Sequence, residues 1–304
     1  MHDNFPMSSV PEARSSTARR PALPAVRDTY PMLGLISSAF PYRMPGPRFG
    51  VYGSLVMVAP CNMACSYCDV GGYAKDERHY LPGWNEMSLT TIRQFVRDEV
   101  SAGRIIYLTG GEPLMFPELV VTLGDEIRQM GGYSVVCTNA SLSGRLEQVS
   151  PYIDEFSVSL KGNEKLGEAA SGLKGKLAFQ VPRRNMIALT GLPNTIEIVV
   201  VMFAGLAVED IVDIYRPLFG RAAFVFKEYR HKATVAHEDH TYTSSLIDLP
   251  DEATVRPMPR EEIRSVYEEL CARHPEHAKD FALVLGGGGE QVVVTSTGEG
   301  VFKR

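Results

Sequence analysis

Short apolar runs and amphipathic stretches alternate along the central part of the chain. The apolar runs are rich in Val, Ile, Leu and Phe, which is typical of strands buried on both faces. We predict strands over residues 50–58, 104–109, 133–138, 154–160, 195–203 and 222–229. A strand–helix alternation of this kind indicates a parallel sheet with right-handed crossover connections.

The stretches between these runs carry apolar residues at helical spacing. Ser88 is a suitable N-cap for the first helix, Pro117 is placed to open the second, and Gly131 is placed to end it. We predict helices over residues 89–100, 117–130, 175–190 and 208–215. Six strand–helix units, with no seventh or eighth evident, predict an α/β fold with a parallel sheet in a partial, open (β/α)6 TIM-like barrel.

Both ends of the chain lack this alternation. Residues 1–48 are rich in Ser, Pro, Ala and Arg, and predict a disordered tail to residue 30 followed by an irregular lead-in over 31–48. The barrel is then expected over residues 49–230, and residues 231–304 are expected to form a C-terminal extension that covers it. Within that extension the sequence predicts a helix over 260–274 and a short strand over 292–294.

Composition narrows the class of protein. The chain has 304 residues, of which 44% are apolar and 22% charged, with a formal net charge of −5. The acidic balance argues against nucleic acid and anionic membranes as partners, and no apolar run reaches the ~18 residues of a membrane span. The first thirty residues do not have the pattern of a secretory signal, so we expect a cytoplasmic protein.

Three cysteines lie close together directly after the first predicted strand. The segment reads Cys61-Asn-Met-Ala-Cys65-Ser-Tyr-Cys68, so the thiols are four and then three residues apart. Three thiolates at this spacing can hold a 4Fe–4S cluster and leave one iron open to another ligand. A zinc site is the alternative, but the next candidate ligand, His79, is distant in sequence. A disulfide framework fits poorly, because the chain has only five cysteines.

Polar motifs follow the next strands, at the edge where parallel barrels carry their functional residues. The first is Thr109-Gly110-Gly111-Glu112-Pro113, whose glycines permit close backbone approach and whose carboxylate can bind an ammonium group. The others, in chain order, are Thr138-Asn139, then Ser157, Ser159 and Lys161 on one side of a strand, and Lys227-Glu228-Tyr229-Arg230. A capping turn is the alternative for the second motif, and a solvated strand end for the last.

The remaining candidates favour structural roles. Cys137 lies within a strand and Cys271 shares the apolar face of a helix, so both are expected in the core, which leaves no cysteines for a second cluster. A metal site over His237–His240 is less favoured than a solvated loop. The glycines at 286–289 lack the Lys-Ser/Thr of a phosphate loop and predict a turn.

Over residues 50–230 these motifs together resemble the radical SAM superfamily. The resemblance implies that Cys61, Cys65 and Cys68 hold a 4Fe–4S cluster whose open iron binds S-adenosylmethionine (SAM). Further cofactor-binding residues implied by the family's pattern are Tyr67, Gly110, Gly111, Glu112, Pro113, Thr138, Asn139, Ser159 and Lys161. In glycyl radical enzyme activases the comparable segment is Asp-x-Lys, so Ser159 departs from that subgroup.

The resemblance implies reductive cleavage of SAM to a 5′-deoxyadenosyl radical that abstracts hydrogen from a substrate. An electron donor such as flavodoxin or ferredoxin is then a required partner. We expect a small-molecule or peptide substrate in a biosynthetic tailoring reaction. Two alternatives stay open: an activase acting on a glycine of a partner enzyme, and a non-catalytic iron–sulfur or zinc protein.

Overall fold

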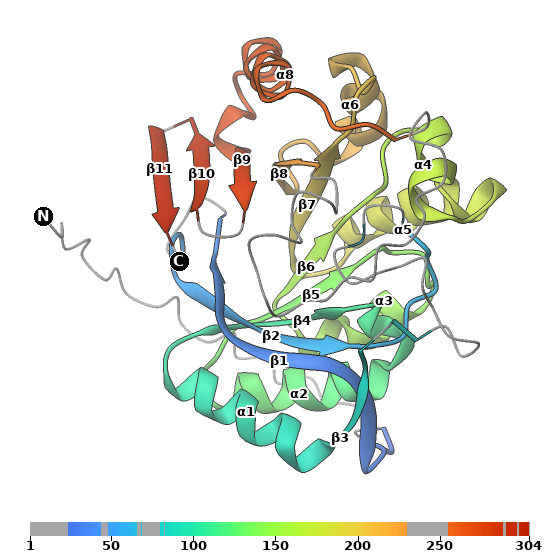
Figure 1. Cartoon of the computed structure of the whole chain (residues 1–304), viewed down its shortest axis with the longest axis vertical. Helices are drawn as coiled ribbons and strands as arrows, with labels where there is room; N and C mark the ends of the chain where they lie inside the picture. Colours follow the sequence, from blue (N-terminus) through green and yellow to red (C-terminus); the bar gives the residue numbers. More distant parts are fainter. Residues whose placement is uncertain are drawn as a thin grey trace, which may run out of the picture.

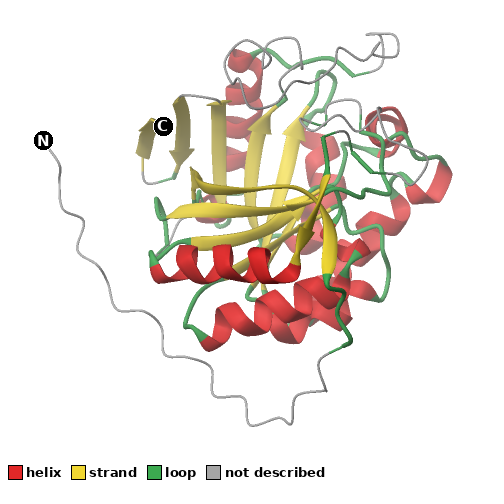
Figure 2. Ribbon diagram, turned by 60° about the horizontal axis from the view of Figure 1, so that its bottom comes forward, coloured by secondary structure: helices red, strands yellow, loops and turns green. Residues whose placement is uncertain are grey.

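A computed structural model describes residues 24–43, 48–65, 68, 80–81, 83–229, 255–287, 290–296 and 298–303. Its strands form one sheet in the order β11-β10-β9-β8-β7-β6-β5-β4-β2-β1-β3. The sheet is strongly curved, and the helices lie around its outer side (Figure 1, Figure 2). Among the described residues, no helix is both long and apolar enough to cross a membrane.

The parallel part of the sheet confirms the six predicted strands. They are β2 (Tyr52–Val58), β4 (Ile105–Gly110), β5 (Ser134–Thr138), β6 (Glu155–Val158), β7 (Thr195–Met202) and β8 (Ala223–Glu228). Because each strand pairs in parallel with the next, their carboxyl ends share one edge. The fold is therefore an open, partial TIM-like barrel, as predicted.

Helices connect successive parallel strands, as the alternation predicted. Ser88 caps α1 by accepting a hydrogen bond from the Thr91 amide at 3.1 Å. The α-helices are α1 (Leu89–Ser101), α2 (Pro117–Gln129), α3 (Arg145–Val149), α4 (Glu164–Ser171), α5 (Gln180–Ala188), α6 (Val208–Tyr215) and α8 (Arg260–Arg273). Single 3-10 turns are η1 (Pro113–Met115), η2 (Ser150–Tyr152), η3 (Gly175–Leu177), η4 (Leu189–Gly191), η5 (Arg216–Leu218) and η6 (Ala278–Asp280).

Apolar layers cover both faces of the curved sheet. The larger lies between the sheet and the helices and includes Val56, Ile106 and Phe156 from strands and Ile92 and Leu123 from helices. The smaller lies on the inner side of the curve and consists of Tyr42, Ile105, Tyr107, Val135, Val225, Val284 and Val293. Alternate residues of each strand thus serve opposite faces, as the pleat requires.

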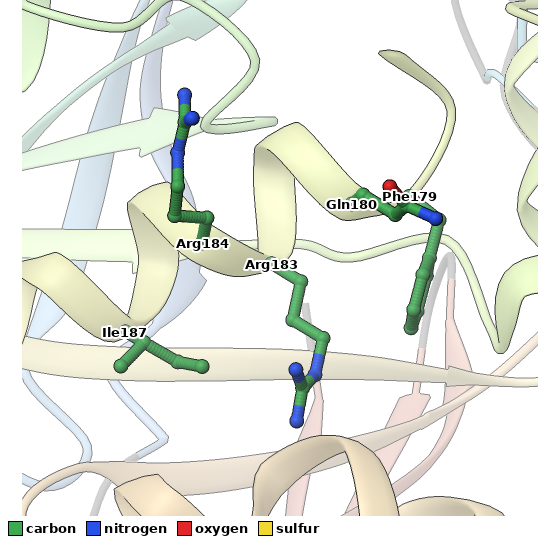
Figure 3. Close-up of a pocket in the computed structure, with 5 residues that line it drawn as sticks. All are labelled: Phe179, Gln180, Arg183, Arg184 and Ile187. Carbon is green, nitrogen blue, oxygen red and sulfur yellow. The ribbon is translucent and has the colours of Figure 1, made fainter. Parts of the chain in front are cut away.

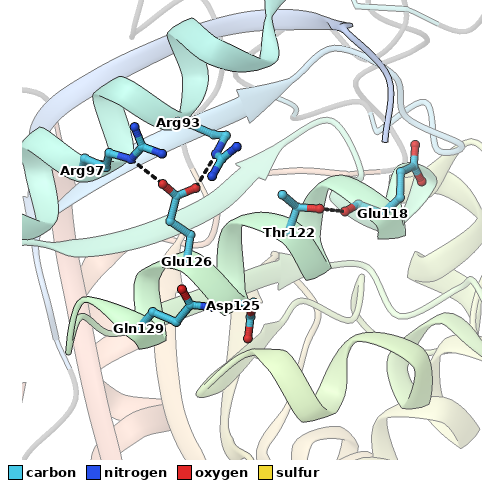
Figure 4. A network of polar contacts seen from close by, with 7 residues as sticks. All are labelled: Arg93, Arg97, Glu118, Thr122, Asp125, Glu126 and Gln129. Carbon is cyan, nitrogen blue, oxygen red and sulfur yellow. Dashed lines mark hydrogen bonds and ion pairs between the residues drawn. The ribbon is translucent and has the colours of Figure 1, made fainter. Parts of the chain in front are cut away.

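Polar contacts join neighbouring helices on the outer surface. Arg93 and Arg97 of α1 both point to Glu126 of α2, with donor–acceptor distances of 2.6 and 2.5 Å (Figure 4). Both arginine side chains are more than 40% exposed, so each pair is worth only ~0.2–1 kcal/mol. These contacts therefore contribute little to the stability of the fold.

The irregular lead-in expected over residues 31–48 is wrong for residues 31–41. Strand β1 (Thr29–Pro41) pairs antiparallel with β2 and with β3 (Asn85–Ser88). Its register against β2 shifts twice, and Ser38 has a positive φ of 51°. These bulges, together with Pro31 and Pro41, interrupt the period-2 pattern by which a strand is predicted from sequence.

The C-terminal residues extend the sheet. Strand β9 (Phe281–Gly287), which was not predicted, runs parallel to β8, and β10 (Glu290–Thr295) and β11 (Gly298–Lys303) continue as an antiparallel meander. The predicted strand over 292–294 and the predicted helix, α8, are confirmed. A hydrogen bond from Arg43 Nε to Gln291 Oε1 at 3.2 Å links the segment after β1 to β10. The division of the chain at residues 49 and 231 remains a prediction.

Candidate active site

The cysteine loop (residues 61–68) leaves the carboxyl end of β2. Cys65 is 9% exposed, while Cys61 and Cys68 are half-buried. The Met63 amide donates to Cys61 Sγ at 3.4 Å, and the Cys68 amide donates to the Cys65 carbonyl at 3.2 Å. The thiols thus occupy the position predicted for them, at the edge where the other strand-end motifs also lie.

Neighbouring segments hold this loop at both ends. The Ala64 amide donates to the Ser171 carbonyl at the end of α4 at 2.9 Å. Pro60 forms a β-bridge with Tyr80, where the chain returns to the sheet. The Tyr80 ring packs edge-to-face on Trp84, with 4.9 Å between ring centroids. The loop is therefore fastened to helix α4 on one side and to an aromatic pair on the other.

Gly110 and Gly111 pack directly against the chain that leads into the cysteine loop. The Gly111 amide donates to the Val58 carbonyl and the Glu112 amide to the Pro60 carbonyl, both at 2.7 Å. A Cβ on Gly110, where φ is 102°, would lie 2.3 Å from the Val58 oxygen, and one on Gly111 2.0 Å from the Pro60 oxygen. Close backbone approach was expected toward a ligand, but these contacts are made with the chain itself.

Glu112 joins the Gly110–Pro113 motif to the loop after β5. Its Oε1 accepts from Thr138 Oγ1 at 2.8 Å and from the Leu114 amide at 3.1 Å, and its Oε2 accepts from the Asn139 amide at 2.8 Å. The side chain is only 1% exposed. Burial raises its pKa, an effect opposed by these hydrogen bonds and by the positive charge of Lys161.

Asn139 connects the same loop to the cysteine loop. Its Nδ2 donates to Asn62 Oδ1 at 3.0 Å, and its Oδ1 accepts from the Ser141 amide at 2.9 Å and from Ser141 Oγ at 2.5 Å. Asn62 Nδ2 in turn donates to Ser141 Oγ at 2.6 Å. Asn62 and Ser141 were not predicted as site residues; an Asn directly after the first cysteine and a Ser two residues after Asn139 are the only sequence signals.

Ser159 and Lys161 lie at the end of β6, as predicted. Lys161 Nζ donates to Ser159 Oγ at 2.8 Å, and the Ser159 amide donates to the Thr138 carbonyl at 3.1 Å. Since the charge of Lys161 acts on Glu112, the two side chains share one electrostatic environment. The structure therefore brings the motifs after β2, β4, β5 and β6 together at one edge of the sheet.

Two buried glutamates on the inner side of the sheet were not predicted. Glu155 is fully buried and its Oε2 accepts from Tyr42 and Tyr133 hydroxyls at 2.7 and 2.9 Å, while Glu197 Oε1 accepts from Ser157 Oγ at 2.7 Å. Burial is the main cause that raises the pKa of both carboxyls, and repulsion by Glu197 raises that of Glu155 further. The sequence signal for each of these two residues was a single Glu within an otherwise apolar strand.

The other predicted residues either make packing and hydrogen-bond contacts within the fold or lie outside the described residues. Glu228 accepts from Arg260 Nε at 2.9 Å and from the Gly286 amide at 2.8 Å, and Tyr229 packs against Phe203. Cys137 and Cys271 pack against the apolar layers as expected. Outside the described residues lie Tyr67, His79, Arg230 and His237–His240.

A separate hollow of about 250 Å³ lies beside α5. It is lined by Phe179, Gln180, Arg183, Arg184 and Ile187 (Figure 3). The Arg183 guanidinium donates hydrogen bonds to the carbonyls of Asp213 and Ile214 near the end of α6, at 3.1 and 3.2 Å. None of the predicted site residues lines this hollow, so we do not assign it to the candidate site.

The donor set of the cysteine loop suits a soft metal centre. Three thiols come from one short loop, and two of them are accessible enough to face a ligand. In the described part of the chain, no three Cys, His, Asp or Glu side chains are gathered closely enough to enclose an ion by themselves. The fit to an iron–sulfur cluster therefore rests on ligand chemistry and on the position of the loop.

Comparison with known proteins identifies the superfamily. The family model of the radical SAM superfamily matches residues 56–218. A search of curated proteins finds no match. Among solved structures, Streptococcus suis SuiB bound to S-adenosylmethionine has a TM-score of 0.54 at 14% identity, covering 75% of this chain and 48% of SuiB.

Two further structures share the fold. SuiB bound to the precursor peptide SuiA has a TM-score of 0.53 at 15% identity and covers 75% of this chain and 47% of that one. A radical SAM methyltransferase from Sphaerobacter thermophilus has a TM-score of 0.50 at 16% identity and covers 73% and 64%. The chain thus spans about half the length of SuiB, and at these identities the similarity shows the fold alone.

Proposed function

The chain belongs to the radical SAM superfamily, whose cofactors are a 4Fe–4S cluster and SAM, and on that premise we propose that it cleaves SAM reductively to abstract hydrogen from a small-molecule or peptide substrate. The observation that carries the proposal is the hydrogen-bonded edge that joins the cysteine loop, Asn139 and Glu112, and that reaches Lys161 through Thr138 and Ser159. Four consecutive strand ends contribute to it, which is where parallel barrels place their catalytic groups.

Within this proposal Cys61, Cys65 and Cys68 hold the cluster. When bound, the cluster and SAM supply the electron and the 5′-deoxyadenosyl radical with which the superfamily begins its reactions. The chain itself contributes position and exclusion of water. We assign delivery of the electron to a flavodoxin or ferredoxin, in a reducing compartment such as the cytoplasm, because the thiols must stay reduced.

The polar residues at the edge have complementary roles toward SAM. A carboxylate has about four acceptor positions. Among the described residues Glu112 uses three of them, and we assign the fourth to the SAM ammonium group. Half-buried Lys161 is the cation that we assign to the SAM carboxylate. The position of Glu112 is set by its neighbours Gly110, Gly111 and Pro113. The loops after β5 and β6 are positioned by Thr138, Asn139 and Ser159.

The substrate is best placed on the inner side of the curved sheet. That face carries polar groups among its apolar residues, namely Cys137, Ser157, Glu197 and Lys227. A peptide substrate is compatible with the fold shared with SuiB, which was solved with a precursor peptide. Ser159 in place of the Asp of glycyl radical activases argues against that alternative.

Anaerobic reconstitution tests the proposal. We expect about four irons per chain, a reduced-cluster paramagnetic resonance signal that changes when SAM is added, and 5′-deoxyadenosine in the mass spectrum after reduction with dithionite. Cys65→Ser should abolish all three, whereas Cys137→Ser should retain the cluster. One metal per chain, or a signal indifferent to SAM, would support the zinc or non-catalytic alternative instead.

A further inference from the structure

We infer that Asn62 is a positioning residue that fixes the distance between the cluster and the SAM-binding loop after β5. The inference rests on the proposed function and concerns a residue to which the sequence analysis assigned no role. Asn62 lies within the cysteine loop, directly after Cys61. It connects this loop to a part of the chain more than seventy residues away.

Both polar groups of the Asn62 side chain are used in this connection. Its Oδ1 accepts from Asn139 Nδ2 at 3.0 Å, and its Nδ2 donates to Ser141 Oγ at 2.6 Å. Asn139 and Ser141 are only 8% exposed each. Two hydrogen bonds from one planar amide, made to buried partners, restrict both the distance and the rotation between the loops.

The loop that Asn62 contacts is itself held rigidly. Ala140, a residue with a side chain, has a φ of 55°, which costs energy unless its surroundings impose it. Its amide donates to Thr138 Oγ1 at 3.0 Å, and its carbonyl accepts from Asn185 Nδ2 of α5 at 2.8 Å. Asn62 is therefore hydrogen-bonded to a rigid loop, and these bonds determine where the cysteine loop lies relative to it.

Glu112 completes a chain of contacts from the cysteine loop to the proposed SAM ammonium site. The Asn139 amide donates to Glu112 Oε2 at 2.8 Å, while the Asn139 side chain binds Asn62. The Asn139 Oδ1 already accepts two hydrogen bonds from Ser141. Asn139 thus acts mainly by joining Glu112 to Asn62, and a shift of either loop would displace the cluster from the SAM amino-acid group.

The test compares Asn62→Ala with a matched control, Asn194→Ala. Asn194 is also half-buried and also joins two segments, since Nδ2 donates to the carbonyls of Ser150 and Ile153 and Oδ1 accepts from Ser150 Oγ. It lies before β7, at the opposite end of the strands from the site. Both variants lose side-chain hydrogen bonds, but only Asn62→Ala loosens the proposed contact.

We expect Asn62→Ala to keep a wild-type iron content and to bind SAM on the order of tenfold more weakly, with a smaller SAM-induced change in the resonance signal. In the protein without iron, residues 138–141 should exchange their amide hydrogens faster in this variant. Asn194→Ala should lower the melting temperature and leave SAM affinity unchanged. Ser141→Ala, a milder change, should weaken SAM binding in the same direction and add little to Asn62→Ala.

Unchanged SAM affinity in both Asn62→Ala and Ser141→Ala would overturn the inference and leave a merely structural contact. Loss of iron from Asn62→Ala would overturn it also, because the loop itself would then depend on Asn62. If the wild-type protein neither binds nor cleaves SAM, the proposed function fails first, and the two failures are thereby distinguished.

Discussion

At the residue scale, the polar side chains of the candidate site bind one another before they bind any ligand. In the part of the chain that the structure describes, Glu112 accepts three hydrogen bonds and Asn139 takes part in four. Such a network is stable only when each member is satisfied, and one altered group affects the others. Substitutions here should therefore change both SAM binding and stability.

Glu112→Gln should weaken SAM binding roughly ten- to a hundredfold while the cluster still assembles. The neutral amide loses charge-assisted binding of an ammonium group, and its NH2 faces at least one donor among Thr138, Asn139 and Leu114. We also expect a loss of about 1–3 kcal/mol in the free energy of unfolding. Calorimetric titration with SAM and urea unfolding measure the two effects, and unchanged SAM affinity would move the ammonium site elsewhere.

Lys161→Met should slow SAM cleavage measured without substrate as well as coupled turnover, because it removes the cation assigned to the SAM carboxylate. Lys161→Arg should restore little, since a planar guanidinium does not replace a compact ammonium hydrogen-bonded to Ser159. Ser159→Asp should also hinder SAM binding by like-charge repulsion. If uncoupled cleavage survives in Lys161→Met, the residue contacts substrate; tighter SAM binding in Ser159→Asp would favour the activase alternative.

Glu155 should make stability depend on pH. Burial and the neighbouring Glu197 raise the pKa of Glu155 to about 8, so the folded state binds a proton that the unfolded state releases at its ordinary, lower pKa. Its favourable contribution is complete below the ordinary pKa and is lost as pH rises toward 8. Relative to Glu155→Gln, the wild-type protein should therefore lose unfolding free energy between about pH 4.5 and pH 8. If the difference in unfolding free energy between the two proteins stays constant over this pH range, the pKa of Glu155 is not raised.

Sequence motifs included Cys61, Glu112, Asn139 and Lys161 as candidate site residues, but they gave no role to Asn62 or Ser141, which connect the cysteine loop to the loop after β5. Cys61, Glu112 and Lys161 belong to patterns whose chemistry is specific. Asn62 and Ser141 are common residue types, and their importance depends on which loops the fold brings together. Long-range pairing of this kind has no local signal in one sequence.

At the scale of elements, the glycines after β4 determine where the cysteine loop can lie. Gly111→Ala would place a Cβ about 2.0 Å from the Pro60 carbonyl, which is backbone and cannot rotate away. We expect a loss of roughly 1–3 kcal/mol in unfolding free energy and a reduced iron content after reconstitution. Gly191→Ala is the control, because its added Cβ would meet no described atom within 4 Å other than those of its chain neighbours. Wild-type iron content in Gly111→Ala would show that the loop tolerates displacement.

Most elements with an uninterrupted period were predicted, whereas β1 and α4, whose patterns are interrupted, were not. Strand β9, a short apolar run that ends in two glycines, was not predicted either. The six parallel strands are continuous apolar runs, and α1 and α2 have clear caps. In β1 two register shifts break the alternation. Helix α4 lies in a glycine-rich segment, and only the structure shows that Gly167 sits against the carbonyls of Lys161 and Ala178.

At the scale of the whole molecule, the C-terminal strands share the core of the barrel. Phe281 of β9 is fully buried, and its ring lies 5.5 Å from those of Phe219 and Phe224 and 5.8 Å from that of Phe226. Phe281→Ala should therefore cost roughly 3–5 kcal/mol and leave one cooperative transition. Val301→Ala, 52% exposed on β11, should change stability by less than ~0.5 kcal/mol. A separate early transition in Phe281→Ala would instead indicate an independent C-terminal unit.

The aromatic pair beside the cysteine loop gives the molecule an intrinsic optical reporter. Trp84 is the only tryptophan in the chain, and it packs on Tyr80, which bridges to Pro60 immediately before Cys61. Indole emission is sensitive to the polarity around the ring and is quenched by a neighbouring chromophore that absorbs in the near ultraviolet, as iron–sulfur clusters do. Fluorescence of the unlabelled protein can therefore follow the filling of this one loop in real time, without interference from any second indole.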